Sequence, residues 1–210
     1  MSIGDLNAPS PCYLYVCYAS QTAARAFQSL DSYLTSRAAP QVAQPILDEL
    51  ADRTRQSASL GVLIDNEVLI IARSTGRRTL STGLGIGSRL PAFCSALGRA
   101  VLSRLTSKEV LEHLASDPLV KLTPKTVDNI LSAAESVERC RTYGWAECDE
   151  ELEMGVRSIA VPISNSSNKT IAALSLSVRA ERMTMDDFRG VHLAAIQEAR
   201  NELIRLKVTF

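Results

Sequence analysis

The chain has 210 residues, of which 46% are hydrophobic and 22% charged, enough apolar material for one large domain or two small ones. Its 23 basic and 23 acidic residues cancel, which argues against direct nucleic-acid binding, because that requires an excess of Lys and Arg. No stretch is apolar for long enough to cross a bilayer, and the residues before the apolar run 13–19 include Asp5 but no Lys or Arg, unlike a signal peptide. We therefore expect a cytoplasmic protein that does not enter a membrane.

Five cysteines, an odd number, are spread along the chain without the C-x-x-C spacing of a metal site. Free thiols in a reducing cytosol are the simplest interpretation. Gly83, Gly85 and Gly87 do not lie between a strand and a helix with the spacing of a dinucleotide-binding motif. The sequence therefore predicts no cofactor.

The first half of the chain predicts two helices followed by three strands. Apolar residues recur with helical spacing over residues 20–36 and again from Pro40 to Ala51. From Ser57 the apolar period changes to two, which predicts strands at 57–64, 67–74 and 79–83. Asp65-Asn66 has the composition of a tight turn between the first two strands.

Three helices are expected next. Ser95 is placed to cap a helix that runs to Leu102. Helical patterns also cover residues 107–115 and 124–143, and Gly144 is placed to end the second of them. Free N–H groups at the helix start after Ser95 would favour a carboxylate or another anion, although every helix has such an end.

Residues 144–178 are the most informative part of the chain. A turn and an acidic loop precede two apolar strands, 156–163 and 170–178, joined by a turn at 165–168. Both faces of each strand are apolar by alternation, which predicts a sheet covered on both sides. Ser158, Ser175 and Ser177 are small polar residues within these otherwise apolar strands. Such serines commonly pack beneath a helix with the hydroxyl bonded to backbone, but they could also leave room for a ligand.

A last helix, 184–206, begins with the capping sequence Thr184-Met185-Asp186-Asp187. The element order is thus helices, three strands, three helices, two or three strands, and a helix. This order predicts an α+β fold, in which an antiparallel sheet has helices packed on both faces.

Four stretches of the chain carry a family resemblance. They are PQVAQPILDELADRT, IGSRLPAFCSALGRAVLSRL, DEELEMGVRSIAVPI, and AALSLSV followed by RMTMDDF. In this order they resemble the effector-binding domain of the isocitrate-lyase-regulator (IclR) family of bacterial transcription factors. The similarity runs from about Leu34 to Leu206 and is strongest to the branch that regulates aromatic-acid catabolism through protocatechuate and β-ketoadipate.

The resemblance implies a GAF-like domain, residues 37–210, that binds a small aromatic or dicarboxylic acid and helps to form homodimers or homotetramers. It implies neither catalysis nor a bound metal. Residues 1–36 would form an N-terminal extension and a linker helix. Family members carry a winged helix-turn-helix before this domain, whereas residues 1–33 show no recognition-helix pattern or basic cluster. We therefore expect promoter DNA to be bound only through a domain that this chain lacks.

The resemblance also assigns ligand contacts. The backbone N–H groups of Ala96 and Leu97, at a helix start, would contact the ligand. Ser175 and Ser177 correspond to a pair of strand serines that bind ligand in the family. These are two of the three serines that strand alternation singles out, so the ligand interpretation becomes the stronger one.

Further contacts follow from the same alignment of motifs. Ser158 stands where some members have Cys. Cys148 stands where some members have an acidic residue that contacts ligand, which argues against a ligand with several hydroxyls or an α-keto group. The apolar wall would be supplied by Leu90, Met154 and Val156.

Three other functions stay open on the sequence alone. An enzyme would need a nucleophile and a base, but His113 and His192 fall on predicted helices without a matching motif and are expected at or near the surface. A metal site would use the acids of residues 149–153, although a solvated loop is the simpler interpretation. A dimerisation module would bind no ligand. Arg89 and Arg157 could be counterions for a carboxylate or could pair with loop acids.

Overall fold

The structure is a computed structural model that describes residues 38–76, 83–164 and 170–206. The helix expected at 20–36, most of the strand expected at 79–83 and the turn at 165–168 lie outside these ranges. The predicted boundary at residue 36 lies there too and stays a prediction. In chain order the elements are α2 (Ala38–Thr54), β1 (Ser57–Ile64), β2 (Glu67–Thr75), β3 (Arg89–Pro91), α3 (Ala96–Leu102), α4 (Ser107–Ser116), α5 (Ile130–Tyr143), β4 (Ala146–Asp149), β5 (Val156–Ser164), β6 (Thr170–Arg179) and α6 (Met185–Arg205).

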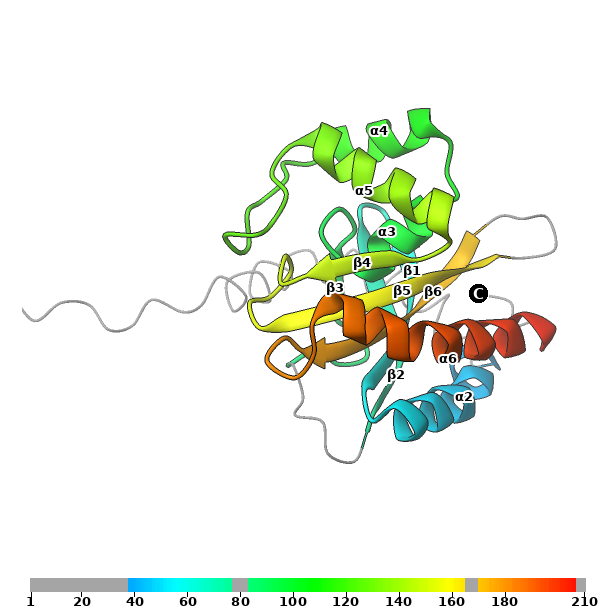
Figure 1. Cartoon of the computed structure of the whole chain (residues 1–210). Coiled ribbons are helices and arrows are strands. Elements are labelled where there is room, and N and C mark those ends of the chain that lie inside the picture. The colour runs from blue at the N-terminus through cyan, green and yellow to red at the C-terminus, as the bar shows by residue number, and fades with distance from the viewer. Residues whose placement is uncertain (1–37, 77–82, 165–169, 207–210) are drawn as a thin grey trace, which may run out of the picture. The chain divides into compact units, whose positions relative to one another are not determined.

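One antiparallel sheet of six strands organises these elements, in the order β3-β2-β1-β6-β5-β4 (Figure 1). The β1–β2 hairpin turns at Asp65, whose φ of 54° lies in the left-handed region that Asp tolerates in tight turns. Strand β6 then pairs with β1, so the two hairpins join at the middle of the sheet.

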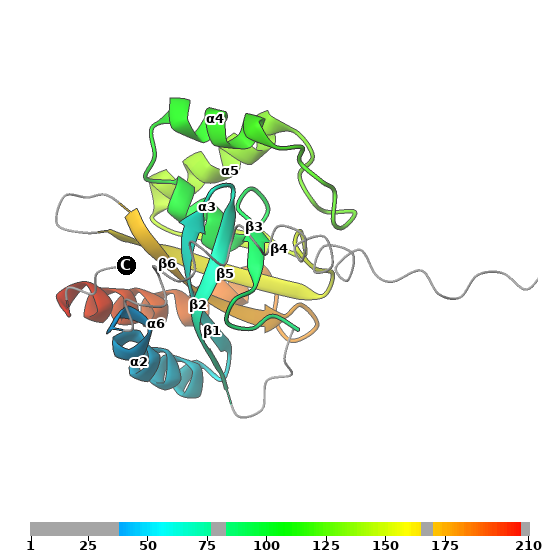
Figure 2. The same cartoon turned by 180° about the vertical axis from the view of Figure 1, so that it is seen from behind.

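Helices cover both faces of the sheet, as the two-sided apolar strands predict. Helices α3, α4 and α5 lie over one face, and α2 and α6 lie over the other (Figures 1 and 2). Side chains at alternate positions of β6 therefore enter two different cores; Leu174 and Leu176 face α2 and α6, whereas Ala173 and Ser175 face α3. The predicted α+β fold with a doubly covered antiparallel sheet is confirmed.

The helix ends follow local capping chemistry. Ser95 Oγ accepts a hydrogen bond from the Gly98 N–H at 3.1 Å, and Thr184 Oγ1 accepts one from the Asp187 N–H at 3.2 Å. Gly144, with φ 84°, ends α5 in the left-handed conformation that suits glycine. These predicted caps are confirmed.

Helix α5 begins at Ile130, so the expected helix over 124–143 is wrong in its first turn and a half. Thr123 Oγ1 donates to the Glu150 carbonyl at 2.8 Å, and Thr126 Oγ1 donates to the Glu151 carbonyl at 2.6 Å. These tertiary bonds hold residues 123–127 in a turn against the 150–155 loop. They override a helical pattern that is visible only locally.

Two short edge strands were not expected as strands. Residues 89–91 form β3 beside β2, and residues 146–149, expected as a turn and an acidic loop, form β4 beside β5. Strands of three or four residues carry too little alternation to be read from sequence.

Helix α3 presses closely on the sheet because small residues lie beneath it. A Cβ atom on Gly61 would lie 2.4 Å from Val68 Cγ1, and one on Gly98 would lie 2.2 Å from the backbone of Ala92. Ala160 and Ala173 continue this small-residue surface across β5 and β6. Farther along the same strands the small residues are serines, and there the contact between helix and sheet opens into a cavity.

Candidate functional site

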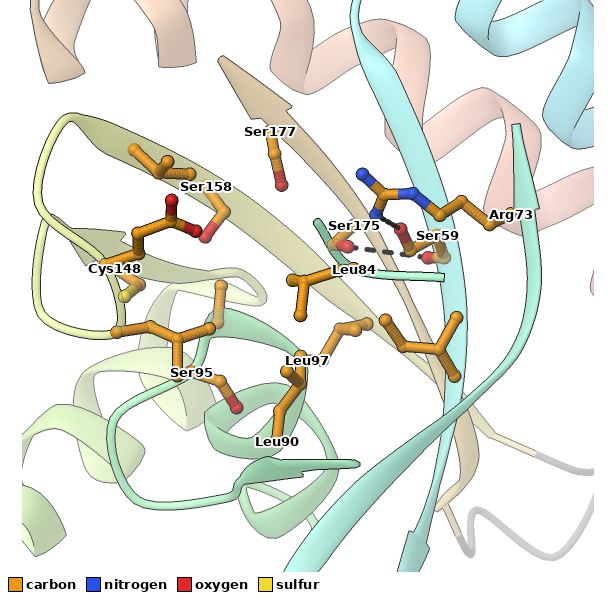
Figure 3. Close-up of a pocket in the computed structure, with 15 residues that line it drawn as sticks. Ser59, Arg73, Leu84, Leu90, Ser95, Leu97, Cys148, Ser158, Ser175 and Ser177 are labelled. Carbon is orange, nitrogen blue, oxygen red and sulfur yellow. Dashed lines mark hydrogen bonds between the residues drawn. The ribbon is translucent and has the colours of Figure 1, made fainter. Parts of the chain in front are cut away.

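A cavity lies between the α3 side of the sheet and the segment that carries β3 and the start of α3 (Figure 3). The cavity is narrow, with a volume of about 30 Å³. The lining residues are Ser59, Ile70, Arg73, Leu84, Leu90, Ser95, Ala96, Leu97, Cys148, Leu152, Glu153, Val156, Ser158, Ser175 and Ser177.

Serine hydroxyls from three adjacent strands form the floor of the cavity. Ser59 of β1 pairs across strands with Ser175 of β6, and Ser177 pairs with Ser158 of β5. Ser175 Oγ donates a long hydrogen bond, 3.5 Å, to the Ser59 carbonyl (Figure 3). A bond at that distance is weak, so this hydroxyl can turn toward a ligand at little cost.

Arg73 brings a full positive charge to the same floor. It lies on β2 directly opposite Ser59, and its Nη1 donates to Ser59 Oγ at 2.7 Å (Figure 3). Burial lowers the pKa of the guanidinium, but arginine remains protonated at any physiological pH. Neither Arg73 nor Ser59 is among the residues predicted from the sequence. The available signal was a charged residue directly after the apolar run 68–72 of β2.

Apolar side chains form the opposite wall. Leu90 of β3, Leu97 of α3 and Leu84 line the cavity (Figure 3). Ala96 and Leu97 are the first two residues of α3, so their backbone N–H groups lie in the first turn, where the helix has no acceptor of its own for them. Polar groups on one side and leucines on the other give the cavity an amphipathic character.

The β4–β5 side of the cavity carries a thiol and a carboxyl group. Cys148 Sγ lies 3.1 Å from the Cys94 carbonyl, and burial raises the pKa of both thiols, which keeps them neutral. Glu153 lies in the loop before β5, where burial raises the pKa of its carboxyl and Arg179 opposes that shift. The end of the cavity away from β2 therefore carries a neutral thiol, Cys148, and an acidic side chain, Glu153.

Eight of the nine residues expected to contact ligand line this one cavity. They are Leu90, Ala96, Leu97, Cys148, Val156, Ser158, Ser175 and Ser177. The ninth, Met154, does not line it and is 50% exposed. Met154 lies in the loop between β4 and β5, where Glu150 (φ 60°) and Gly155 (φ 78°) have positive φ and strand alternation does not apply. The ligand-binding role of the eight residues stays a prediction.

The loop that carries Leu152 and Glu153 is held by Arg99 of α3. Its side chain, 2% exposed, donates from Nη1 and Nη2 to the two carboxylate oxygens of Glu151, each at 2.6 Å. Burial would lower the pKa of Arg99, but the hydrogen bonds to Glu151, together with its charge and the neighbouring thiols Cys148 and Cys94, raise that pKa on balance. Arg99 also donates to the carbonyls of Phe93 and Glu147 at 3.0 and 2.9 Å. The wall of the cavity is thus fixed to the helix above it.

The other acids of residues 149–151 are ion-paired too, which weakens the metal-site interpretation. Asp149 Oδ1 lies 2.6 Å from Arg157 Nε, and Glu150 Oε1 lies 2.5 Å from Lys125 Nζ. Arg89 pairs with Glu67 at 3.0 Å. Arg89 and Arg157 therefore balance nearby acids, one of the two roles left open for them.

Each of the two histidines has a structural contact within the described part of the chain. His113 Nδ1 lies 2.9 Å from Asn66 Oδ1 at the partly buried contact between α4 and the β1–β2 turn. His192 was expected near the surface, but it is buried and packs edge-on against Phe188 at 5.4 Å between ring centroids. Both residues have structural contacts that account for them.

Comparison with known proteins identifies the family. The family described as "Bacterial transcriptional regulator IclR C-terminal" matches residues 31–204. The Pca regulon regulatory protein of Pseudomonas putida is 35% identical over 173 residues, which are 82% of this chain and 60% of that protein. The p-hydroxybenzoate hydroxylase transcriptional activator of Acinetobacter baylyi is 32% identical over 187 residues, 87% of this chain and 69% of that protein. The chain thus spans about 60% of the length of the first of these relatives.

Solved structures agree with these relatives. The inducer-binding domain of the PobR transcription factor from Acinetobacter, a double mutant in complex with 3-hydroxybenzoic acid, superposes with a TM-score of 0.74 at 32% identity, covering 80% of this chain and 98% of that one. An IclR homologue from Microbacterium hydrocarbonoxydans complexed with 4-hydroxybenzoate has a TM-score of 0.69 at 27% identity and covers 79% of this chain and 66% of that one. The relatives are regulators rather than enzymes. The chain therefore belongs to the IclR family of bacterial transcriptional regulators, with the family's C-terminal domain at residues 31–204.

Proposed function

We propose that this domain senses a small aromatic carboxylic acid in the serine-lined cavity and thereby modulates promoter binding by a DNA-binding domain of the full-length regulator. The observation that carries the proposal is the two-sided chemistry of the cavity. Arg73 and the serine hydroxyls form one side, and leucines form the other.

A carboxylate suits the polar side. A guanidinium binds a carboxylate through charge-assisted hydrogen bonds, and Ser175 and Ser177 add hydroxyl donors beside it. The ring of an aromatic acid suits the opposite wall, where Leu84, Leu90 and Leu97 offer apolar contact. The similar domains complexed with 3-hydroxybenzoic acid and 4-hydroxybenzoate support this ligand class.

The narrow cavity suggests how binding of a ligand could change the conformation of the domain. An apolar cavity of about 150 Å³ holds benzene, whereas the cavity here offers only about 30 Å³ by the same measure. We infer that an aromatic acid binds a conformation in which the leucine wall and the loop tied to α3 lie farther from the floor. By linkage, the acid raises the population of that conformation, which is how a bound ligand can change a distant DNA-binding domain.

We also propose that the domain assembles into a homodimer or homotetramer. Large apolar side chains are exposed on several helices; Leu131 of α5 is 72% exposed and Val191 of α6 is 63% exposed. Burial of such side chains between subunits removes apolar surface from water. Light scattering at micromolar concentration should give a multiple of the chain mass, and a monomeric mass would contradict this assembly.

A thermal-shift titration tests the sensing role. 3-Hydroxybenzoate and 4-hydroxybenzoate should raise Tm, with about 2.7 kcal/mol of added stability at a hundredfold excess over Kd. 4-Hydroxybenzyl alcohol, which lacks the carboxylate, should give little shift, and Arg73→Gln should remove the response to the acids. Chromatography should show the acids unchanged after long incubation. If no acid shifts Tm, a dimerisation module without ligand becomes the better interpretation, and a time-dependent product would indicate an enzyme.

A further inference from the structure

The cavity carries opposite charges at opposite sides. Arg73 lies on β2, and Glu153 lies in the loop that leads into β5. The strand order β2-β1-β6-β5 separates these sides by three inter-strand spacings, about 14 Å between backbones. The serines of β1, β6 and β5 fill the floor in between. A ligand that extends across this floor meets a cation at one end and a carboxyl group at the other.

From this arrangement we propose that Glu153 selects aromatic acids with a hydroxyl group opposite the carboxylate and rejects dicarboxylic acids. The inference rests on the proposed function, because it assumes that Arg73 receives the carboxylate of the ligand. It goes further because it assigns a role to the end of the cavity at Glu153. It also distinguishes hydroxylated aromatic acids from dicarboxylic acids, both of which the sequence left as candidate ligands.

Glu153 differs from the other acidic residues of its loop in that it forms no ion pair within the described residues. The other acids of residues 149–153 each pair with a basic side chain within 4.0 Å. Glu153 forms no such pair among residues 38–76, 83–164 and 170–206, although Arg179 is near enough to act on it electrostatically. Its carboxyl group is partly buried in the cavity wall. A partly buried carboxyl without a hydrogen-bonded cation is suited to accept a hydrogen bond from a ligand donor.

The backbone that carries this carboxyl is held in place by hydrogen bonds. The backbone carbonyl of Glu153 accepts from the Val156 N–H at 3.2 Å, and the preceding turn is clamped through Glu151 to Arg99. A second carboxylate on the ligand would face Glu153 in a medium that screens charge poorly, so the two acids would repel each other. A ligand hydroxyl would instead donate to Glu153. Such a repulsive element is an effective source of specificity.

The test compares 4-hydroxybenzoate with terephthalate, which differ only in the group opposite the carboxylate. Kd values are measured by isothermal titration calorimetry at neutral pH. The wild-type domain should bind 4-hydroxybenzoate at least tenfold more tightly than terephthalate, and also at least tenfold more tightly than benzoate. Glu153→Gln should shrink the preference over terephthalate by about tenfold, chiefly through tighter binding of terephthalate. Glu181→Gln, which removes the same charge from an exposed position, should leave the preference unchanged.

The outcomes separate the two claims. If both acids bind and the wild-type domain does not prefer 4-hydroxybenzoate, or if Glu153→Gln leaves the preference intact, the role of Glu153 is refuted while the sensing function stands. If neither acid binds, the proposed function and this inference fail together. The wild-type comparison of 4-hydroxybenzoate with benzoate and terephthalate decides the question even if the Gln variant does not fold.

Discussion

Arg99 and Glu151 face each other in two parallel hydrogen bonds, Nη1 to Oε1 and Nη2 to Oε2, both 2.6 Å long. The arginine is 2% exposed and the glutamate 13% exposed, so each is shielded from water. Removing one partner leaves the other buried and uncompensated, which typically costs 3–5 kcal/mol. Arg99→Met should therefore lower the free energy of unfolding by about 3–5 kcal/mol in urea titrations.

The exposed pair Lys108–Glu112 on α4 provides a matched control. Its side chains are 86% and 63% exposed, and Lys108→Met should change stability by less than about 0.5 kcal/mol. The double variant Arg99→Met/Glu151→Leu should recover part of the loss, because no charge is left buried. If Arg99→Met is as stable as wild type, the Arg99–Glu151 ion pair does not hold the loop that precedes β5.

Replacement of two helical glycines, Gly98 and Gly190, by alanine should change the free energy of unfolding in opposite directions. A Cβ on Gly98 would lie 2.2 Å from Ala92 backbone atoms, so Gly98→Ala should lower the free energy of unfolding by about 1–3 kcal/mol or more. A Cβ on Gly190 of α6 would meet no atom of residues 38–76, 83–164 and 170–206 within 4 Å, so Gly190→Ala should raise the free energy of unfolding by about 0.5–1 kcal/mol. Equal effects in denaturant titrations would contradict the close approach of α3 to Ala92.

His192 should make stability fall in mild acid. Burial lowers its pKa below the ordinary 6.5, so below pH 6.5 the unfolded chain takes up a proton that the folded chain resists. Stability is therefore lost as pH falls through this range. His192→Leu should lose less stability than wild type between pH 7.5 and pH 5.5, as measured by urea unfolding at both values. Identical losses would show that His192 does not contribute to the pH dependence.

The serine pair offers a direct test of the cavity floor. Ser175→Ala combined with Ser177→Ala should weaken binding of a hydroxybenzoate by about 1–3 kcal/mol, the usual effect of deleting hydrogen bonds to a charged group. Stability should change little, since alanine fits where serine does. Ser74→Ala, on the face of β2 opposite the cavity, is the matched control and should leave affinity unchanged. Wild-type affinity in the double variant would reduce the serines to packing residues.

The parts of the site that could be predicted are those set by local sequence. Alternation alone places Ser175 and Ser177 on one face of β6, and the cap at Ser95 fixes where α3 begins. Ser59 and Arg73 could not be found this way. Their place in the site depends on the pairing of β1 with β6, a contact between residues 116 positions apart in the chain.

The errors also have physical causes in long-range contacts. The turn before α5 depends on hydrogen bonds from Thr123 and Thr126 to a loop that follows α5 in the chain. Met154, whose ligand contact stays a prediction, lies in the loop between β4 and β5, where Gly155 has a positive φ and strand alternation does not set the direction of a side chain. Local pattern thus predicts elements and their caps, whereas tertiary contacts decide which residues converge.

The pairing of Ser59 with Ser175 also determines when the sheet can be completed during synthesis of the chain. Strands β1 and β2 can form a hairpin soon after they leave the ribosome, but β1 has no neighbour on its other edge until β6 emerges. Throughout that interval the nascent chain exposes an apolar strand edge that can pair with other chains. The serine-lined cavity is therefore among the last features to form, and a chain released before β6 would lack this cavity and be prone to aggregate.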